Sequence, residues 1–357
     1  MNPKLLTLCA AACACTTPAW AQGSVTLSGV VDLAARRVSH DGTGSLTALV
    51  SGSNASSRLV FSGKEDLGGG LSAGFHLEHG LLADTGLPAS AKFFDRRSTV
   101  SLASQSLGEL RLGRDFVPSY SNWSRYDPFG YVGVARSANL VSATPTGPIR
   151  AAFGSNANTT VRSDNGVQWL LPAGLGGLEG GAMFAPGEGG AVASGLARLT
   201  GLRVGYANQA FSVSAATTRS KNSQTTAGSF RDSAVGGSVE LHSVRLSAAW
   251  REFRYDSAKQ LLWMLGAVAT FGLHEVKASW IRSEHQGQVG GASIAGTDAT
   301  QIGLGYVYNL SKRSALYATV ARISNDGAAR YVISDGPSGI SAGGRSRGYE
   351  AGVRHRF

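Results

Sequence analysis

The strongest constraint on the fold of this chain is the strict alternation of apolar with polar or small residues in several segments. In TQIGLGYVYNL (300–310), every even position from Ile302 onward is apolar, and the positions between are mostly polar or glycine. Successive side chains of a strand point to opposite faces, so one face here is too polar for a packed core. The alternation recurs in VRSDNGVQWLL (161–171), GLRVGYA (201–207) and GYEAGVRHRF (348–357). We therefore expect strands between an apolar medium and water, because an arginine within a strand needs water or a partner.

Two kinds of connection separate these strands. Short turns occur at 67–72, 106–109, 174–179, 208–211, 241–244, 272–275 and 310–314, and longer polar segments occur at 39–55, 117–158, 285–298 and 324–345. Seven short turns join seven pairs of strands, and one strand before the first turn and one after the last bring the predicted number to sixteen. An even strand number with short turns at one end and long loops at the other is typical of an antiparallel transmembrane β-barrel.

The chain length agrees with a single barrel domain over residues 22–357. This length provides about 21 residues for each of sixteen strands and its connection, whereas a transmembrane strand needs about 9–11 residues. The alternative is a secreted β-sandwich, but a sandwich accepts few inward arginines and is complete in about 100 residues. Aromatic residues near predicted strand ends fit the girdles at the two membrane interfaces: Trp169, Tyr206, Trp250, Trp263, Trp280 and Tyr306.

The first 21 residues have the pattern of a signal peptide that is removed on export. Lys4 precedes an apolar run over 5–15, and Ala19-Trp20-Ala21 follows as a small-x-small cleavage site. All three cysteines lie in this segment, so the mature chain would have no thiol for disulfide, metal or nucleophile chemistry. A lipoprotein acylated at Cys15 is the alternative, but no Leu lies three positions before that residue.

Charge and hydropathy exclude two other classes. Without Lys4, the 33 Lys and Arg against 23 Asp and Glu leave a mature net charge of +9. For an exported protein this excess would act on small anions or acidic lipid headgroups, and we expect no nucleic acid partner. The longest apolar run of the mature chain, over 261–269, is far shorter than the roughly 20 residues of a membrane helix.

An ordered set of segments resembles the Gram-negative porins of beta-proteobacterial type. The matching stretches are SVTLSGVVDLA (24–34), SSRLVFSGKEDLGGGLSAGFHLEHG (56–80), RRSTVSLAS (96–104), LGELRLGRD (107–115), VRSDNGVQW (161–169), LGYVYNLSKRSALYA (304–318) and the terminal GVRHRF. The resemblance implies a homotrimer of sixteen-stranded barrels in the outer membrane, each with its third loop, here 117–158, folded into the pore. It also implies that Phe357 is the signal read by the outer-membrane assembly machinery, and that lipopolysaccharide surrounds the barrel.

Four arginines are candidates for a basic wall at the pore constriction. Counting faces from the neighbouring apolar residues directs Arg58, Arg97 and Arg162 to the interior, and the resemblance places basic wall residues at Arg58, Arg114 and Arg162. Strict alternation after Leu110 and Leu112 would instead turn Arg114 outward. We therefore expect a β-bulge beside the long loop.

The long loop is the second part of the candidate constriction. Between 117 and 158 it contains Arg125, Arg136 and Arg150 but only one carboxylate, Asp127, so its net charge is +2. Many porins oppose the basic wall with an acidic loop, and this departure favours anions over cations. The alternative is that these arginines lie at the trimer contact or the outer mouth.

No motif of the sequence indicates an enzyme. His76 and Glu78 share one strand face while His79 is on the other, so the three would form no metal site, and no catalytic set, cofactor motif or phosphate loop is evident. We expect a passive channel for small hydrophilic solutes and ions with weak anion selectivity. The alternatives are a channel specific for an anion or organic acid and, in a different class, a barrel that acts as an adhesin or structural protein.

Overall fold

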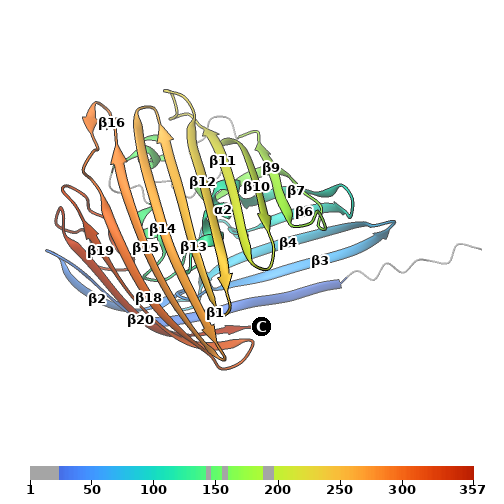
Figure 1. Cartoon of the computed structure of the whole chain (residues 1–357), viewed down its shortest axis with the longest axis horizontal. Coiled ribbons are helices and arrows are strands. Elements are labelled where there is room, and N and C mark those ends of the chain that lie inside the picture. Colours follow the sequence, from blue (N-terminus) through green and yellow to red (C-terminus); the bar gives the residue numbers. More distant parts are fainter. Residues whose placement is uncertain (1–23, 142–145, 155–159, 188–196) are drawn as a thin grey trace, which may run out of the picture.

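The computed structural model describes residues 24–141, 146–154, 160–187 and 197–357 (Figure 1). The expected signal peptide (1–21) and, within the expected loop 117–158, residues 142–145 and 155–158 lie outside these residues. The strands are β1 (Ser24–His40), β2 (Gly44–Ser51), β3 (Arg58–Gly68), β4 (Leu71–Leu82), β5 (Leu87–Pro88), β6 (Ser98–Ser104), β7 (Gly108–Phe116), β8 (Arg162–Leu170), β9 (Leu178–Ala185), β10 (Arg198–Ala207), β11 (Phe211–Lys221), β12 (Phe230–Leu241), β13 (Val244–Tyr255), β14 (Ala258–Phe271), β15 (His274–Gln286), β16 (Gln288–Val289), β17 (Ala292–Ser293), β18 (Ala299–Asn309), β19 (Ser314–Asn325) and β20 (Arg345–Arg356). The helices are α2 (Pro118–Tyr126), η1 (Ser137–Leu140) and α3 (Pro148–Phe153).

The antiparallel sheet closes on itself into a barrel of sixteen strands. Its first strand, β1, pairs with β3 on one side and with the last strand, β20, on the other. Among the described residues the sheet has 18 strand segments. Because β2 and β3 both pair with β1 and occupy the same position around the wall, and β5 is a two-residue addition to β4, sixteen positions remain. The predicted strand number is confirmed.

All seven predicted short turns join consecutive strands at one end of the barrel. The other end has the longer connections, with one difference from the expectation. Residues 39–55 are not one loop, because β1 continues to His40 and pairs with β2 above the tight turn at 41–43. The Ser, Thr and Gly content of this segment is typical of a loop, but the register that pairs Val38 with Leu46 keeps it in the sheet.

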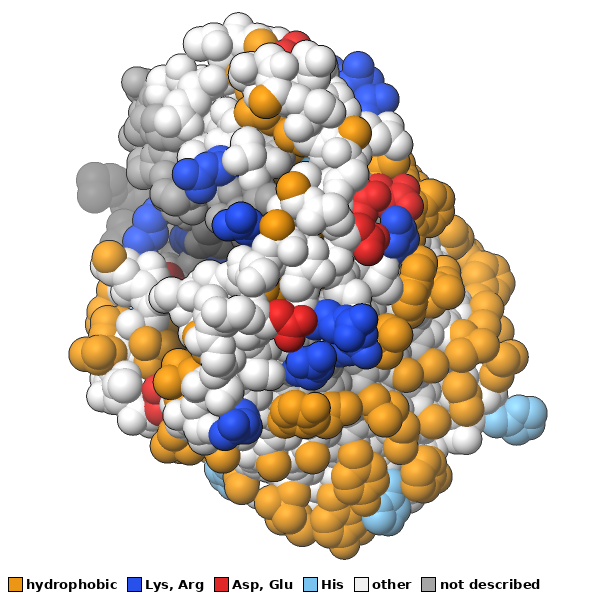
Figure 2. All heavy atoms as spheres, turned by 90° about the vertical axis from the view of Figure 1, so that its left-hand side faces the viewer, with side chains coloured by type: hydrophobic (Ala, Val, Ile, Leu, Met, Phe, Trp, Pro, Cys, Tyr) orange, Lys and Arg blue, Asp and Glu red, His pale blue; other side chains and the backbone are white. Residues whose placement is uncertain are grey.

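The outer face of the barrel is apolar, and the inner face is polar. On adjoining strands Leu304, Val320 and Tyr349 point outward with 52%, 42% and 52% of their surface exposed, whereas the inward Gln301 is fully buried. Figure 2 shows the resulting belt of apolar side chains, with charged side chains grouped above it. This arrangement is that of a barrel whose wall contacts lipid. No helix in the described part of the chain is long and apolar enough to cross a membrane.

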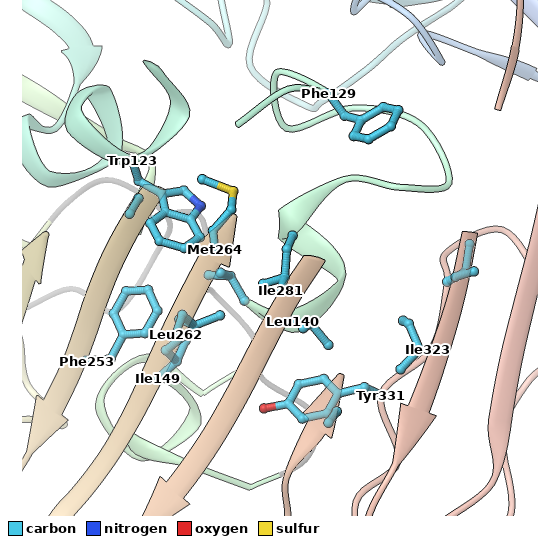
Figure 3. Close-up of a cluster of buried hydrophobic side chains, with 14 of the residues drawn as sticks. Trp123, Phe129, Leu140, Ile149, Phe253, Leu262, Met264, Ile281, Ile323 and Tyr331 are labelled. Atoms are coloured by element: carbon cyan, nitrogen blue, oxygen red, sulfur yellow. The ribbon is translucent and has the colours of Figure 1, made fainter. Parts of the chain in front are cut away.

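The described part of the long segment after β7 lies inside the barrel against its inner wall. Trp123 and Leu140 from this segment pack with Phe253, Leu262 and Ile281 from β13, β14 and β15 in one buried cluster (Figure 3). The glycines of the inner face provide the space. A Cβ atom on Gly236 would lie 2.3 Å from the ring of Tyr126. The inward side chains of residues 261–269 are apolar because they pack against this segment.

Candidate functional site

The four candidate wall arginines lie close together on the interior side of neighbouring strands. Arg58 begins β3, Arg97 directly precedes β6, Arg114 is in β7 and Arg162 begins β8. The wall in this region runs β3, β4, β6, β7, β8. Val100 and Leu102 of β6 point outward, and so do Leu110 and Leu112 of β7, which directs the alternate positions inward.

Glu78 on β4 is the acidic partner of the first part of this wall. Its Oε1 lies 3.1 Å from Nε of Arg58 and 2.5 Å from Nε of Arg96, and His76 lies 3.4 Å from Oε2. The pair of His76 and Glu78 could be predicted from the sequence, but Arg96 could not. Arg96 precedes β6 in an irregular segment, where alternation cannot assign a face.

A second network surrounds Arg97. Its Nε lies 3.5 Å from Oδ2 of Asp115 and donates a hydrogen bond of 3.0 Å to the Thr99 hydroxyl. Arg111 donates to the same Asp115 carboxylate at 2.7 Å and to both oxygens of Glu109 at 3.0 and 2.9 Å. This part of the wall therefore has two guanidinium groups and two carboxylates, and its net charge is zero.

Arg114 lies beside the expected bulge. The register of β7 with β8 shifts between Gly113 and Asp115, as the sequence analysis required. Gly113 has φ +124°, and a Cβ atom there would lie 2.1 Å from the Ser98 carbonyl oxygen, so only glycine fits. The Arg114 guanidinium pairs with Asp164 and donates from Nε to the Asp95 carbonyl oxygen at 2.7 Å.

Arg162 differs from the other three because no carboxylate of the described residues lies within ion-pair distance. Its guanidinium carbon lies 4.4 Å from the centroid of the Phe116 ring, and its Nε is buried without a hydrogen-bond acceptor. Only 8% of the residue surface is exposed. Arg162 is therefore a positive charge that the surrounding wall does not neutralise, next to other cations.

The charged residues of the long segment have different surroundings. Arg125 on α2 pairs with Glu179 at 2.5 Å, Arg136 donates from Nε to Oδ1 of Asn139 at 3.1 Å, and Arg150 on α3 is exposed. Asp127 is buried and accepts hydrogen bonds from the backbone N–H groups of Phe129, Tyr131 and Ser137 and from the Ser137 hydroxyl.

The burial of Asp127 has an electrostatic consequence. Burial raises the pKa of its carboxyl, against the lowering effect of the hydrogen bonds from Ser137 and the backbone. Burial likewise lowers the pKa of the Arg136 guanidinium. Asp127 therefore stabilises the conformation of its own segment and does not point into the interior as an acidic group opposite the wall.

A buried ion pair that the sequence analysis missed fixes α2 to the wall. Arg251 on β13 and Asp232 on β12 are 0% and 2% exposed, and Nη2 lies 2.7 Å from Oδ2. The Ser119 hydroxyl of α2 donates to the same Oδ2 at 2.6 Å. Alternation directs both charged residues inward, but nothing in the sequence shows that they pair with each other or that α2 binds to them.

A cavity of about 340 Å³ lies between α2 and the arginine wall. Its lining includes Arg97, Arg111 and Arg203 together with Glu78 and Asp115. The cavity is next to the start of α2 at Pro118 and Ser121, so α2 narrows the interior at the height of the arginine wall. No group of three or more potential metal ligands is present in the described ranges.

Comparisons with known proteins agree with this geometry. The family described as Gram-negative porin matches residues 7–328. The sequence is 34% identical to outer membrane porin protein 32 of Delftia acidovorans over 100% of both chains, and 26% identical to an outer membrane porin protein of Bordetella pertussis over 87% of this chain and 84% of that one. The anion-selective porin from Comamonas acidovorans superposes with a TM-score of 0.80 at 32% identity, over 94% of this chain and 100% of that one. The trimer form of OmpT from Vibrio cholerae gives 0.61 at 15% identity, over 94% and 99%, which shows the fold alone.

Proposed function

Because this chain belongs to the Gram-negative porin family and is therefore an outer-membrane channel, we propose that it passes small hydrophilic solutes and ions with a weak preference for anions. The channel itself follows from the family and the barrel. The preference for anions is the part that rests on the interior charges. A ring of charge at a narrow point selects ions by sign, because the field of the wall raises the local concentration of counter-ions.

The proposal rests on the balance of positive and negative charge among the residues that line the interior of the barrel. The arginines of this region are Arg58, Arg96, Arg97, Arg111, Arg114, Arg125, Arg162 and Arg203, and the carboxylates that pair with them are Glu78, Glu109, Asp115, Asp164 and Glu179. Among these named groups there are three more cations than carboxylates. Arg162 is the one of these arginines that has no ion pair among the described residues.

The zero-current potential of the purified protein in a planar bilayer under a potassium chloride gradient tests this proposal. We expect the sign that corresponds to excess chloride flux. Replacing Arg58 and Arg162 together by glutamine should shift the potential toward zero. A wild-type protein that prefers potassium would contradict the proposal, because other carboxylates would then dominate the narrow part of the channel.

A channel specific for an organic anion is the second candidate, and Arg162 favours it. A guanidinium group that is buried over an aromatic ring and has no carboxylate partner among the described residues can bind a carboxylate or phosphate directly. If Arg162 acts in this way, chloride conductance should saturate and should fall when the organic anion is added. Conductance proportional to salt concentration would leave passive diffusion as the function.

We also propose the assembly features that the family resemblance implies. These are removal of residues 1–21, a homotrimer, contact with lipopolysaccharide, and delivery by the outer-membrane assembly machinery through Phe357. The backbone of Phe357 supports the last of these, because it exchanges hydrogen bonds with Gly29 at 3.0 and 3.2 Å where the last strand meets the first. Gels of unheated and heated protein test the trimer, and a single monomer-sized band in both lanes would count against it.

A further inference from the structure

A continuous row of basic residues crosses the outer face of four neighbouring strands. The register pairs Arg219 of β11 with Arg231 of β12, Arg231 with Arg254 of β13, and Arg254 with Lys259 of β14. Figure 1 shows these strands side by side. The alternate residues Asp232, Phe253 and Gln260 are buried on the inner face, so the row points outward.

Three successive like-charge pairs in a row are unfavourable without an external partner. Directly opposite residues of an antiparallel pair have Cβ atoms about 4.5–5.5 Å apart, and like charges at these positions repel. No ion pair or hydrogen bond of the four side chains occurs in the described part of the chain. The outward Glu252 and the turn residue Asp256 are on the same hairpin, and neither has an ion pair with the row. By contrast, the outward Arg282 lies 2.8 Å from Glu284, and Arg347 lies 3.4 Å from Asp41.

A hollow with more cations adjoins the row. It has a volume of about 320 Å³, and it is lined by Arg198, Leu199, Thr200, Arg219, Ser220, Lys221 and Ser229. Arg198 of β10 is directly opposite Lys221 of β11. Arg219 therefore belongs to both features, and the hydroxyl groups of the exposed Thr200 and Ser229 provide further donors. Guanidinium groups bind phosphate oxygens in bidentate fashion, and such a hollow suits a phosphate group.

The height of the row relative to the membrane identifies the partner. The outward Trp250 and Trp263 are paired across β13 and β14 with ring centroids 6.4 Å apart. They are four residues below Arg254 and Lys259, and such aromatic pairs lie at the interface between hydrocarbon and headgroups. At about 3.3 Å per residue the row is roughly 13 Å further along the strands, within the headgroup layer. It is also at the end of the barrel opposite the short turns, which is the extracellular end.

We propose that Arg219, Arg231, Arg254 and Lys259, with Arg198 and Lys221 beside them, bind the phosphate groups of lipopolysaccharide in the outer leaflet. This inference rests on the outer-membrane orientation of the proposed function, but not on ion selectivity. The row faces away from the lumen, so its loss changes lipid binding and leaves conduction unchanged. The site holds the lipid against β10–β14 by ion pairs that offset the repulsion within the row.

The test is the affinity of purified protein in detergent for purified lipopolysaccharide. Variant R231Q/R254Q removes the two central cations. The matched control K312Q/R313Q removes two exposed cations from the short turn at the opposite end. We expect the row variant to bind roughly thirty-fold more weakly, because each cation near a lipid surface contributes about 1 kcal/mol and 1.4 kcal/mol is tenfold. The control and R231K/R254K should retain most of the wild-type affinity.

Two further arms identify the ligand and separate this inference from the proposed function. Enzymatically dephosphorylated lipopolysaccharide should bind the wild type as weakly as intact lipopolysaccharide binds the row variant, and inorganic phosphate at equal concentration should not displace the lipid. Equal loss in the row variant and the control, or unchanged binding of the dephosphorylated lipid, would overturn the inference. Heat-modifiable gel mobility checks folding, and the zero-current potential of the row variant should equal that of the wild type whatever its sign.

Discussion

Replacing Asp232 by alanine should release α2 from the barrel wall. The Arg251 guanidinium would remain fully buried beside Trp123 and Phe253, but without the two hydrogen bonds of 2.9 and 2.7 Å that it donates to Asp232. The Ser119 hydroxyl of α2 would lose its acceptor as well. Removing one partner of a buried ion pair costs about 3–5 kcal/mol, because the remaining charge is left uncompensated.

The assay is the urea midpoint for loss of the folded, heat-modifiable form in detergent, together with single-channel current noise. Asp232→Ala should lower the midpoint clearly and increase current fluctuations, since α2 is no longer held. The control is Glu240→Ala, which breaks the 2.7 Å ion pair between Glu240 and Arg245. The side chain of Glu240 is 40% exposed, and that of Arg245 is 52% exposed. An exposed pair contributes at most about 1 kcal/mol. Equal effects of the two substitutions would refute the reasoning, and so would failure of Asp232→Ala/Arg251→Met to restore part of the loss.

Two other substitutions and one deletion test separate parts of the structure. Gly236→Val should destabilise the barrel by about 1–3 kcal/mol in the urea assay and change the conductance, because it overpacks the contact with Tyr126; Gly237→Ala, on the outer face, should leave the conductance unchanged. Asp127→Asn should shift the zero-current potential less than Arg162→Gln does, since the Asp127 carboxylate is enclosed by its own segment; the reverse order would show that Asp127 faces the ion path. Deleting Phe357 should reduce the amount of folded protein in outer-membrane fractions, because the last hydrogen bonds to Gly29 are lost; wild-type levels would argue against its role in assembly.

Alternation and turn chemistry were sufficient to predict the strands of the barrel. Both are local properties, and a register slip of one residue would place Leu304 or Val320 in the lumen, so the pattern specifies the pairing. The bulge at Arg114 could be predicted for the same reason, because a basic residue on the wrong face of an otherwise regular strand requires a change of register. The hairpin of β1 and β2 was missed because its composition is that of a loop.

The candidate site could be predicted only in part. Alternation assigned faces to Arg58, Arg97 and Arg162, but ion pairs join residues that are distant in the sequence. For example, Arg114 pairs with Asp164, 50 residues away, and Arg125 pairs with Glu179. The sequence therefore showed which side chains face the interior, but not which charges are neutralised there. The hydrogen bonds of Asp127 could not be predicted either. They depend on the conformation of a loop, and a loop has no periodic pattern from which side-chain directions can be inferred.

The most direct test of the central claim is the zero-current potential of Arg162→Glu in a potassium chloride gradient, with Lys312→Glu in an exposed short turn as the matched charge reversal. The claim is that the uncompensated charge of Arg162 sets the preference for anions. It predicts that Arg162→Glu moves the potential toward potassium preference, or reverses its sign, while Lys312→Glu stays near the wild-type value. Equal shifts in both variants would contradict the claim, because selectivity would then follow the total charge of the protein and not the charge at the narrow part of the channel.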